Sequence, residues 1–297
     1  MRELCLHVIV QDREEEVRRQ LEVVLSKPYF DVVRYCNGGS RDGTKSTIEK
    51  YAKQHRRRTR VELHHRRWDD DYSAQDNVLL RCASEGDWIL VQDSDEIPSV
   101  PLLEHLREAA QRSEIEGYDM ASIPSLTCLD GRLEHDLEGF IAGVRSGVFH
   151  PFRKNWFFRS CPRVRMFGSP HREPRRLQNA PDAYGKTSYS FDWRKTDLPY
   201  PYVHYKTTWD FVLNDVLHAW IDPNGSNYTL DQATEMQTCV PRRVKTSKDL
   251  RRWLESGVPE DHPIWIFAEK HRDSDRAIRN WWPVLCKGAG RKFEVWV

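Results

Sequence analysis

The chain has 297 residues, of which 31% are charged and 39% hydrophobic, with a formal net charge of +1 at pH 7. This length can bury a full core, and the balanced charge gives no default case for nucleic acid or an anionic membrane as partner. No stretch is long and apolar enough for a signal sequence or membrane span, and the seven cysteines lack metal-type spacing, so we expect a soluble, cytoplasmic protein with reduced thiols.

The first half of the sequence alternates strand-like and helix-like segments. The expected strands are residues 4–10, 30–36, 60–65, 87–92 and 118–126. The expected helices are residues 14–25, 45–54, 73–84 and 100–112, the third beginning at a Ser73 cap and stopping before Gly86. Strands separated by helices predict an α/β fold with a mostly parallel sheet that is flanked by helices on both faces.

Beyond Gly131 the periodicity weakens into stretches rich in arginine and aromatic residues. Helices are expected again at residues 208–221, 247–255 and 264–280. We expect residues 1–130 to form a nucleotide-binding half, and residues 131–297 an α+β elaboration that completes the site within one continuous globular unit.

Three carboxylates end the fourth strand, in the stretch WILVQDSDEIP: Asp93, Asp95 and Glu96. Ligands of open parallel sheets bind at the carboxyl ends of strands, and an all-oxygen site suits Mg²⁺ or Mn²⁺. The alternative is a turn that caps the following helix, where acidic residues are also favoured. A D-x-D pair alone does not decide between them.

A second loop, NGGSRDGT, follows the second strand at residues 37–44. Its glycines would let the backbone approach a bound nucleotide, although the same residues also suit an ordinary turn. The loop is neither a dinucleotide-binding G-x-G-x-x-G sequence nor a Walker A loop.

The chain resembles family 2 glycosyltransferases of the GT-A fold over residues 4 to about 100. The resemblance rests on the order of strands and helices, on the loop NGGSRDGT and on the later stretch SAQDNVLLRCASEGDWILVQDSDE, which ends in the carboxylates. In that family the second strand commonly ends in a D-D-G-S-x-D-G-T-like loop and the fourth in a D-x-D element. Asn37 and Gly38 replace the usual acidic pair, which leaves the nucleobase open.

The resemblance implies a metal-dependent transfer of a sugar from a nucleoside diphosphate sugar, with Mn²⁺ or Mg²⁺ acting on the leaving diphosphate. Asp93 and Asp95 would be metal ligands, with Glu96 orienting them. The donor-binding residues that it implies are Asn37, Gly38, Gly39, Ser40, Asp42, Asn77 and Asp93.

Family 2 enzymes generally invert the anomeric centre, which requires a base. The sequence HREP resembles the family's His-Glu element, so Glu173 is our candidate, with His171 beside it. Asp136 is the alternative base, and Glu138 and Asp192 are further rivals. A late histidine, His204, would be a further metal ligand, unless it is simply a structural residue of a short strand.

Several alternatives stay open. Trp68 and Tyr72 would line the donor pocket or pack in the core. The acceptor would be a glycan, a lipid-linked molecule, a protein or a modified nucleic acid. Basic clusters at residues 55–60, 153–176 and 241–252 leave room for a nucleic-acid-binding protein or a DNA-modifying glycosyltransferase, and a nucleotidyltransferase would also use metal-binding carboxylates.

Overall fold

The computed structural model describes residues 2–69, 71–129, 132–168, 172–177, 189–190 and 193–206. Its contacts divide the chain into two units, of which the first comprises Met1–Gly168 and Arg172–Tyr205. Apart from Lys206, the second unit lies outside the described residues, as do the three helices expected after residue 207, His171 and Asp192.

The first part of the chain forms the alternating strands and helices that the sequence predicts. The strands are β1 (Leu4–Val10), β2 (Val32–Asn37), β3 (Arg60–His65) and β4 (Trp88–Asp93), and the helices are α1 (Glu14–Val24), α2 (Thr44–His55), α3 (Tyr72–Leu80) and α4 (Val100–Glu116). The four strands pair in parallel in the order β3-β2-β1-β4, so their carboxyl ends share one edge.

Later strands widen this sheet to the order β3-β2-β1-β4-β8-β6-β13-β5. The remaining elements are β5 (Glu96–Pro98), β6 (Met120–Leu129), β7 (Arg132–Leu133), α5 (Leu137–Arg145), β8 (Arg153–Arg159), β9 (Val164–Phe167), β10 (Glu173–Leu177), β11 (Tyr189–Ser190), β12 (Lys195–Asp197) and β13 (Tyr202–Lys206). β8 is antiparallel to both β4 and β6. Segments from both sides of residue 130 therefore build one sheet.

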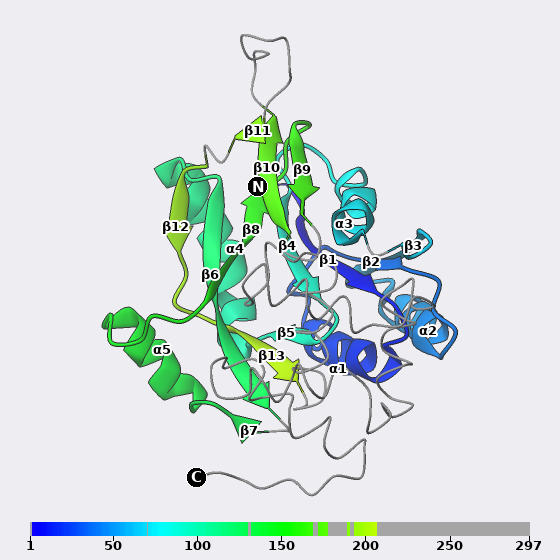
Figure 1. Ribbon diagram of the computed structural model, residues 1–297, viewed down its shortest axis with the longest axis horizontal. Coiled ribbons are helices and arrows are strands. Elements are labelled where there is room, and N and C mark those ends of the chain that lie inside the picture. The colour runs from blue at the N-terminus through cyan, green and yellow to red at the C-terminus, as the bar shows by residue number, and fades with distance from the viewer. Residues whose placement is uncertain are drawn as a thin grey trace, which may run out of the picture. The chain divides into compact units, whose positions relative to one another are not determined.

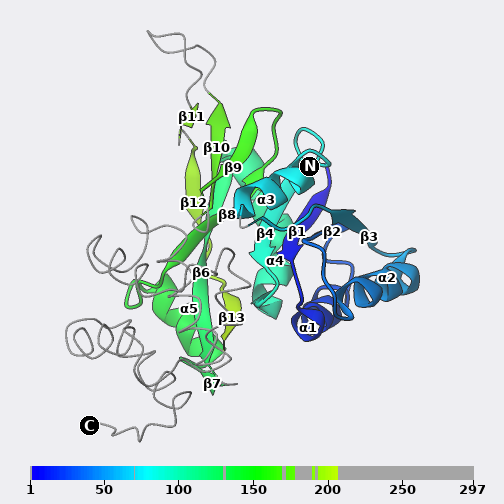
Figure 2. The same ribbon diagram turned by 45° about the vertical axis from the view of Figure 1, so that its right-hand side comes forward.

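Helices cover both faces of the parallel strands, as expected for an α/β fold (Figure 1). Figure 2 shows β1, β2 and β3 between α3 on one side and α1 and α2 on the other. Alternate side chains of β1 separate accordingly: Leu4 and Leu6 pack on the side of α1 and α4, whereas Cys5 packs on the opposite side.

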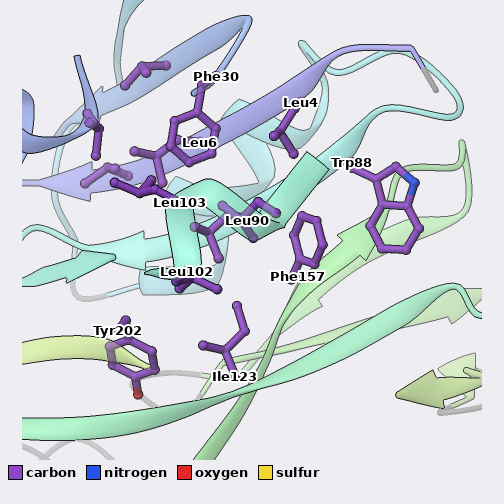
Figure 3. Packing of buried hydrophobic residues seen from close by; sticks show 14 of the residues in the cluster. Leu4, Leu6, Phe30, Trp88, Leu90, Leu102, Leu103, Ile123, Phe157 and Tyr202 are labelled. Atoms are coloured by element: carbon purple, nitrogen blue, oxygen red, sulfur yellow. The ribbon is translucent and has the colours of Figure 1, made fainter. Parts of the chain in front are cut away.

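The largest cluster of buried residues fills the layer between the sheet and helices α1 and α4 (Figure 3). Trp88 and Phe157 contact each other there, with ring centroids 4.9 Å apart, which joins β4 to β8. Leu102 and Leu106 pack onto them from α4. Each such buried side chain contributes about 1.5–3 kcal/mol of transfer free energy, so this layer holds the sheet on which the site is built.

Two helix caps differ from the sequence interpretation. The Ser73 cap is wrong: α3 begins one residue earlier, with Asp71 accepting a hydrogen bond from Ala74 N, and ends at Leu80 rather than near Gly86. The cap of α4 is Ser99, whose hydroxyl accepts from Leu102 N. Because Ser99 performs the capping, the preceding carboxylates are left for another role.

None of the helices in the described ranges combines the length and apolar character of a membrane span.

Candidate active site

Hydrogen bonds from helix α1 fix the turn between β4 and β5. Gln20, fully buried, donates hydrogen bonds to the carbonyl oxygens of Asp93 (3.2 Å) and Glu96 (2.7 Å), and Tyr35 donates to the amide oxygen of Gln20. Glu96 closes the turn by accepting from Asp93 N at 3.1 Å. Asp93 and Asp95 therefore stand on a fixed turn at the carboxyl end of β4.

Strand β13 brings a histidine to this turn. In the antiparallel ladder of β5 and β13, His204 lies opposite Glu96, and Tyr205 N donates to the carbonyl oxygen of Asp95. As a result His204 Nε2 lies 3.4 Å from Asp95 Oδ2, and Nδ1 lies 3.9 Å from Glu96 Oε1. The structure thus places three of the predicted site residues together.

Lys154 of β8 faces the same turn. Its ammonium group pairs with Glu96 and lies 3.6 Å from Asp93 Oδ2. The ammonium also lies 3.6 Å from the centroid of the Trp156 ring, on the same face of β8. The aromatic face holds the cation next to the carboxylates.

Arg172 joins helix α3 to the turn. Its Nε lies 2.6 Å from Asp76 Oδ2, and its Nη2 donates to Asp93 Oδ1 at 2.7 Å. The guanidinium lies over the rings of Trp156 (4.8 Å) and Tyr72 (5.5 Å), and its side chain is only 2% exposed. Arg172 and Lys154 therefore face the two different oxygens of Asp93.

The pKa values of the carboxyl groups in this cluster are shifted in different directions. Burial raises the pKa of Asp76 to about 7, against the opposing attraction of Arg172, and burial also raises the pKa of Glu96. Burial alone would raise the pKa of Asp93 too, but Arg172 and Lys154 together hold it below the usual range. Arg172 and Lys154 therefore favour the ionised form of Asp93.

The glycine loop after β2 is built from its own polar groups. The amide oxygen of Asn37 accepts from Gly39 N, Ser40 N and the Ser40 hydroxyl. Asp42 accepts from Thr44 N and, across from α1, from Glu14 N. The side-chain oxygens of Asn37 and Asp42 thus shape the loop, and its backbone lies beside the ends of β1 and β2.

Gly38 has no room for a side chain. A Cβ there would lie 2.9 Å from Cε3 of Trp68, 3.1 Å from Trp68 Cβ and 3.3 Å from Gln11 Cβ. Trp68 N also donates to the Gly38 carbonyl, which fixes the approach. Trp68 and Tyr72 pack against Ile9, in keeping with the core-packing alternative.

Replacing Gly38 by alanine is therefore expected to destabilise the fold. The added methyl group would meet Trp68 and Gln11, and such overpacking typically costs about 1–3 kcal/mol. Urea unfolding followed by circular dichroism should show a lower midpoint at an unchanged slope. A midpoint equal to that of the wild type would contradict the close contact between the loop and Trp68.

Three other predicted residues have contacts that do not involve the side chains of this cluster. Both polar atoms of the Asn77 amide bond to the backbone of Met166, so this side chain fastens β9 to α3. Asp136 caps α5 by accepting from Gly139 N. Glu173 is exposed and pairs with Phe167 in the hairpin of β9 and β10, while the preceding Arg172 is buried. In the HREP stretch, it is Arg172 that reaches the carboxylates.

The sequence interpretation missed the parts played by Gln20, Lys154 and Arg172. The sequence does distinguish Gln20, because it is a polar residue on the otherwise apolar face of α1 formed by Val17, Leu21 and Val24. Lys154 alternates with Trp156 in a strand, which places both on one face. Nothing in the local sequence distinguishes Arg172 from the many arginines around it.

A second group of potential metal ligands, Glu3, Cys5 and Asp87, lies at the opposite edge of the sheet. Both oxygens of Asp87 accept backbone N–H groups, and Arg34 lies 3.5 Å from Cys5 Sγ and 3.8 Å from Glu3. Burial also raises the pKa of the Cys5 thiol to about 12. These groups are satisfied by hydrogen bonds and by Arg34.

Known structures resemble this chain at low sequence identity. S. aureus TarS 1-349 in complex with UDP-GlcNAc is 14% identical, with 96% of this chain and 79% of that chain covered and a TM-score of 0.45. The mannosyltransferase PcManGT from Pyrobaculum calidifontis, in complex with GDP-Man and Mn²⁺, is 13% identical, with 97% and 85% covered and a TM-score of 0.41. No curated protein sequence gives a significant match.

The sequence model of Glycosyl transferase family 2 matches residues 5–169, which is more than half of the chain. The match spans β1 to β9, and so contains the glycine loop and the Asp93 turn. The sheet order and the helices on both faces confirm the predicted fold class. The chain therefore belongs to glycosyltransferase family 2 and is a glycosyltransferase with the GT-A fold.

Proposed function

We propose that this glycosyltransferase takes its sugar from a nucleoside diphosphate sugar, with one divalent cation bound beside the Asp93 turn. The observation that carries the proposal is the pair formed by Asp95 and His204 at the carboxyl end of β4, where Asp95 Oδ2 and His204 Nε2 lie 3.4 Å apart. A carboxylate oxygen and an imidazole nitrogen are both groups that ligate divalent cations.

The residues fit a metal ion at Asp95 and His204. Two adjacent ligands on an octahedral ion at about 2.1 Å are separated by about 3 Å, close to the 3.4 Å between Asp95 Oδ2 and His204 Nε2. The imidazole favours Mn²⁺ over Mg²⁺. Asp93, included among the ligands from sequence, faces Arg172 and Lys154 instead, so Asp95 would be the carboxylate that ligates.

The bound cation would neutralise charge on the departing diphosphate. The chain's own contribution is to position the donor. The nucleoside would lie against the glycine loop at Gly39, where an added Cβ would have no other atom within 4 Å. Asn37 and Asp42 would act by holding that loop, and Asn77 by holding β9.

Transfer with inversion also requires a group that removes the proton of the acceptor. Of the two carboxylates indicated by the sequence, we propose Glu173, because it is exposed whereas Asp136 is used in capping α5. Glu173→Gln should abolish transfer while donor binding persists. Loss of both would indicate a different role for Glu173.

The donor proposal is tested by calorimetric titration of the protein with UDP, GDP, dTDP and CMP, each with Mn²⁺, Mg²⁺ or EDTA. We expect one nucleotide to bind at least about tenfold more tightly with Mn²⁺ than with EDTA, because metal and diphosphate neutralise each other's charge at the site. The identity of that nucleotide also defines the nucleobase. Equal affinity with and without metal would contradict metal dependence, and failure of all nucleotides would contradict the donor class.

A further inference from the structure

Arg172 is a buried cation that contacts two elements of the site at once. It pairs with Asp76 on α3 through Nε and with Asp93 on β4 through Nη2. Its backbone oxygen accepts from the Trp156 indole at 3.3 Å, which attaches the residue to β8 as well. Arg172 therefore connects α3, β4 and β8 beside the Asp93 turn.

From this geometry we infer that Arg172 is a positioning residue of the transfer reaction: it orients Asp93 toward the donor, and Asp76 keeps Arg172 in that orientation. The inference rests on the donor site proposed above. Neither Arg172 nor Asp76 would touch the donor, and both would change donor affinity through Asp93.

The guanidinium of Arg172 is rigid and planar, so its position next to Asp76 restricts where Nη2 can lie. Nε forms an ion pair with Asp76 Oδ2 without hydrogen-bond geometry, whereas Nη2 donates to Asp93 Oδ1. The rings of Tyr72 and Trp156, with centroids 5.5 Å and 4.8 Å from the guanidinium carbon, also restrict its movement. With Oδ1 bonded to Arg172 and Oδ2 facing Lys154, the carboxylate of Asp93 has little freedom to rotate.

Among the described residues, the polar contacts of Asp76 are limited to Arg172. Asp76 is 1% exposed, and neither of its oxygens has a hydrogen-bond partner there, so the ion pair with Arg172 is its one polar contact in that part of the chain. The cap of α3 is Asp71, not Asp76. Burying a carboxylate without a partner costs free energy, and on α3 the ion pair with Arg172 offsets that cost.

The test compares Asp76→Asn, Arg172→Lys and the double variant with wild type, by calorimetric titration with UDP and with GDP in the presence of Mn²⁺. Asparagine keeps the shape of Asp76 without its charge, and lysine keeps the charge of Arg172 without its fork. Arg34→Lys is the matched control. Arg34 lies on β2, away from the Asp93 turn, and like Arg172 it is a buried arginine in an ion pair, here with Glu62. Thermal unfolding of each variant reports on folding separately.

We expect Arg172→Lys and Asp76→Asn each to weaken Mn²⁺-dependent nucleotide binding by about 10–100-fold, the effect that groups surrounding the ligands of a metal site have, because Asp93 stands on the same turn as Asp95. The double variant should be no weaker than Arg172→Lys, because Asp76 acts through Arg172. Arg34→Lys should bind as the wild type does, even if its unfolding temperature falls by a similar amount.

Folded Asp76→Asn or Arg172→Lys protein with wild-type affinity would overturn the inference and leave the donor proposal standing. Effects that multiply in the double variant, or an equal loss of affinity in Arg34→Lys, would also overturn it, since both describe general destabilisation. Failure of the wild-type protein to bind any of UDP, GDP, dTDP and CMP would instead remove the proposed donor site and the inference together.

Discussion

Replacing Asp95 by alanine is expected to reduce metal-dependent donor hydrolysis by about 10²–10³-fold, since a bound cation supplies several kcal/mol of charge stabilisation at the leaving group. Asp95 lies on the fixed turn after β4, 3.4 Å from His204. The substitution removes one side of the proposed cation site. Rates are measured by the release of free sugar from the donor, with Mn²⁺ varied.

Two comparisons make the Asp95 result specific. Glu104→Ala removes an equal charge from α4, at an exposed ion pair with Lys27, and should leave the rate unchanged. Excess Mn²⁺ should recover part of the activity of a His204→Gln variant, because Asp95 remains there to ligate. An Asp95→Ala protein that hydrolyses donor at the wild-type rate would contradict the proposed site of the cation.

The second large effect is on stability. Arg172→Met is expected to lower the free energy of unfolding by about 3–5 kcal/mol, because breaking a buried ion pair leaves uncompensated carboxylates. Here Asp76 would lose its ion-pair partner, and Asp93 would keep only Lys154, 3.6 Å from its Oδ2. Methionine keeps most of the buried volume, so the loss reports charge rather than packing. Urea unfolding at pH 7.5 measures it.

The same cluster offers an internal control. Adding Asp76→Asn to Arg172→Met removes the carboxylate left without its partner, and should recover about 1–3 kcal/mol of the loss. If Arg172→Met costs less than about 1 kcal/mol, the ion pairs seen at Asp76 and Asp93 contribute little to folding.

The parallel half of the fold follows from sequence periodicity. Strands β1 and β3 have the expected limits because each is an uninterrupted run between turn residues, with β1 buried on both faces. The three residues of β5 were not predicted, since so short a strand has no periodicity of its own. Its place depends on pairing with β13, more than 100 residues later in the chain.

In the site, too, local sequence features could be predicted, whereas contacts between distant parts of the chain could not. Asp93 and Asp95 could be singled out because their spacing and position after a strand are local features. The register that places His204 opposite Glu96 is not encoded near either residue. For the stretch before β10, the resemblance directed attention to Glu173, whereas the burial of Arg172 and Pro174 on the same side leaves Glu173 exposed.

The central claim is tested most directly by measuring hydrolysis of UDP- and GDP-sugars by the wild-type protein, with Mn²⁺ and again with EDTA, beside the Asp95→Ala variant. The account predicts slow hydrolysis of one donor class that requires both the metal and Asp95. Hydrolysis that persists in EDTA, or that is unchanged in Asp95→Ala, would contradict a cation held at the turn between β4 and β5.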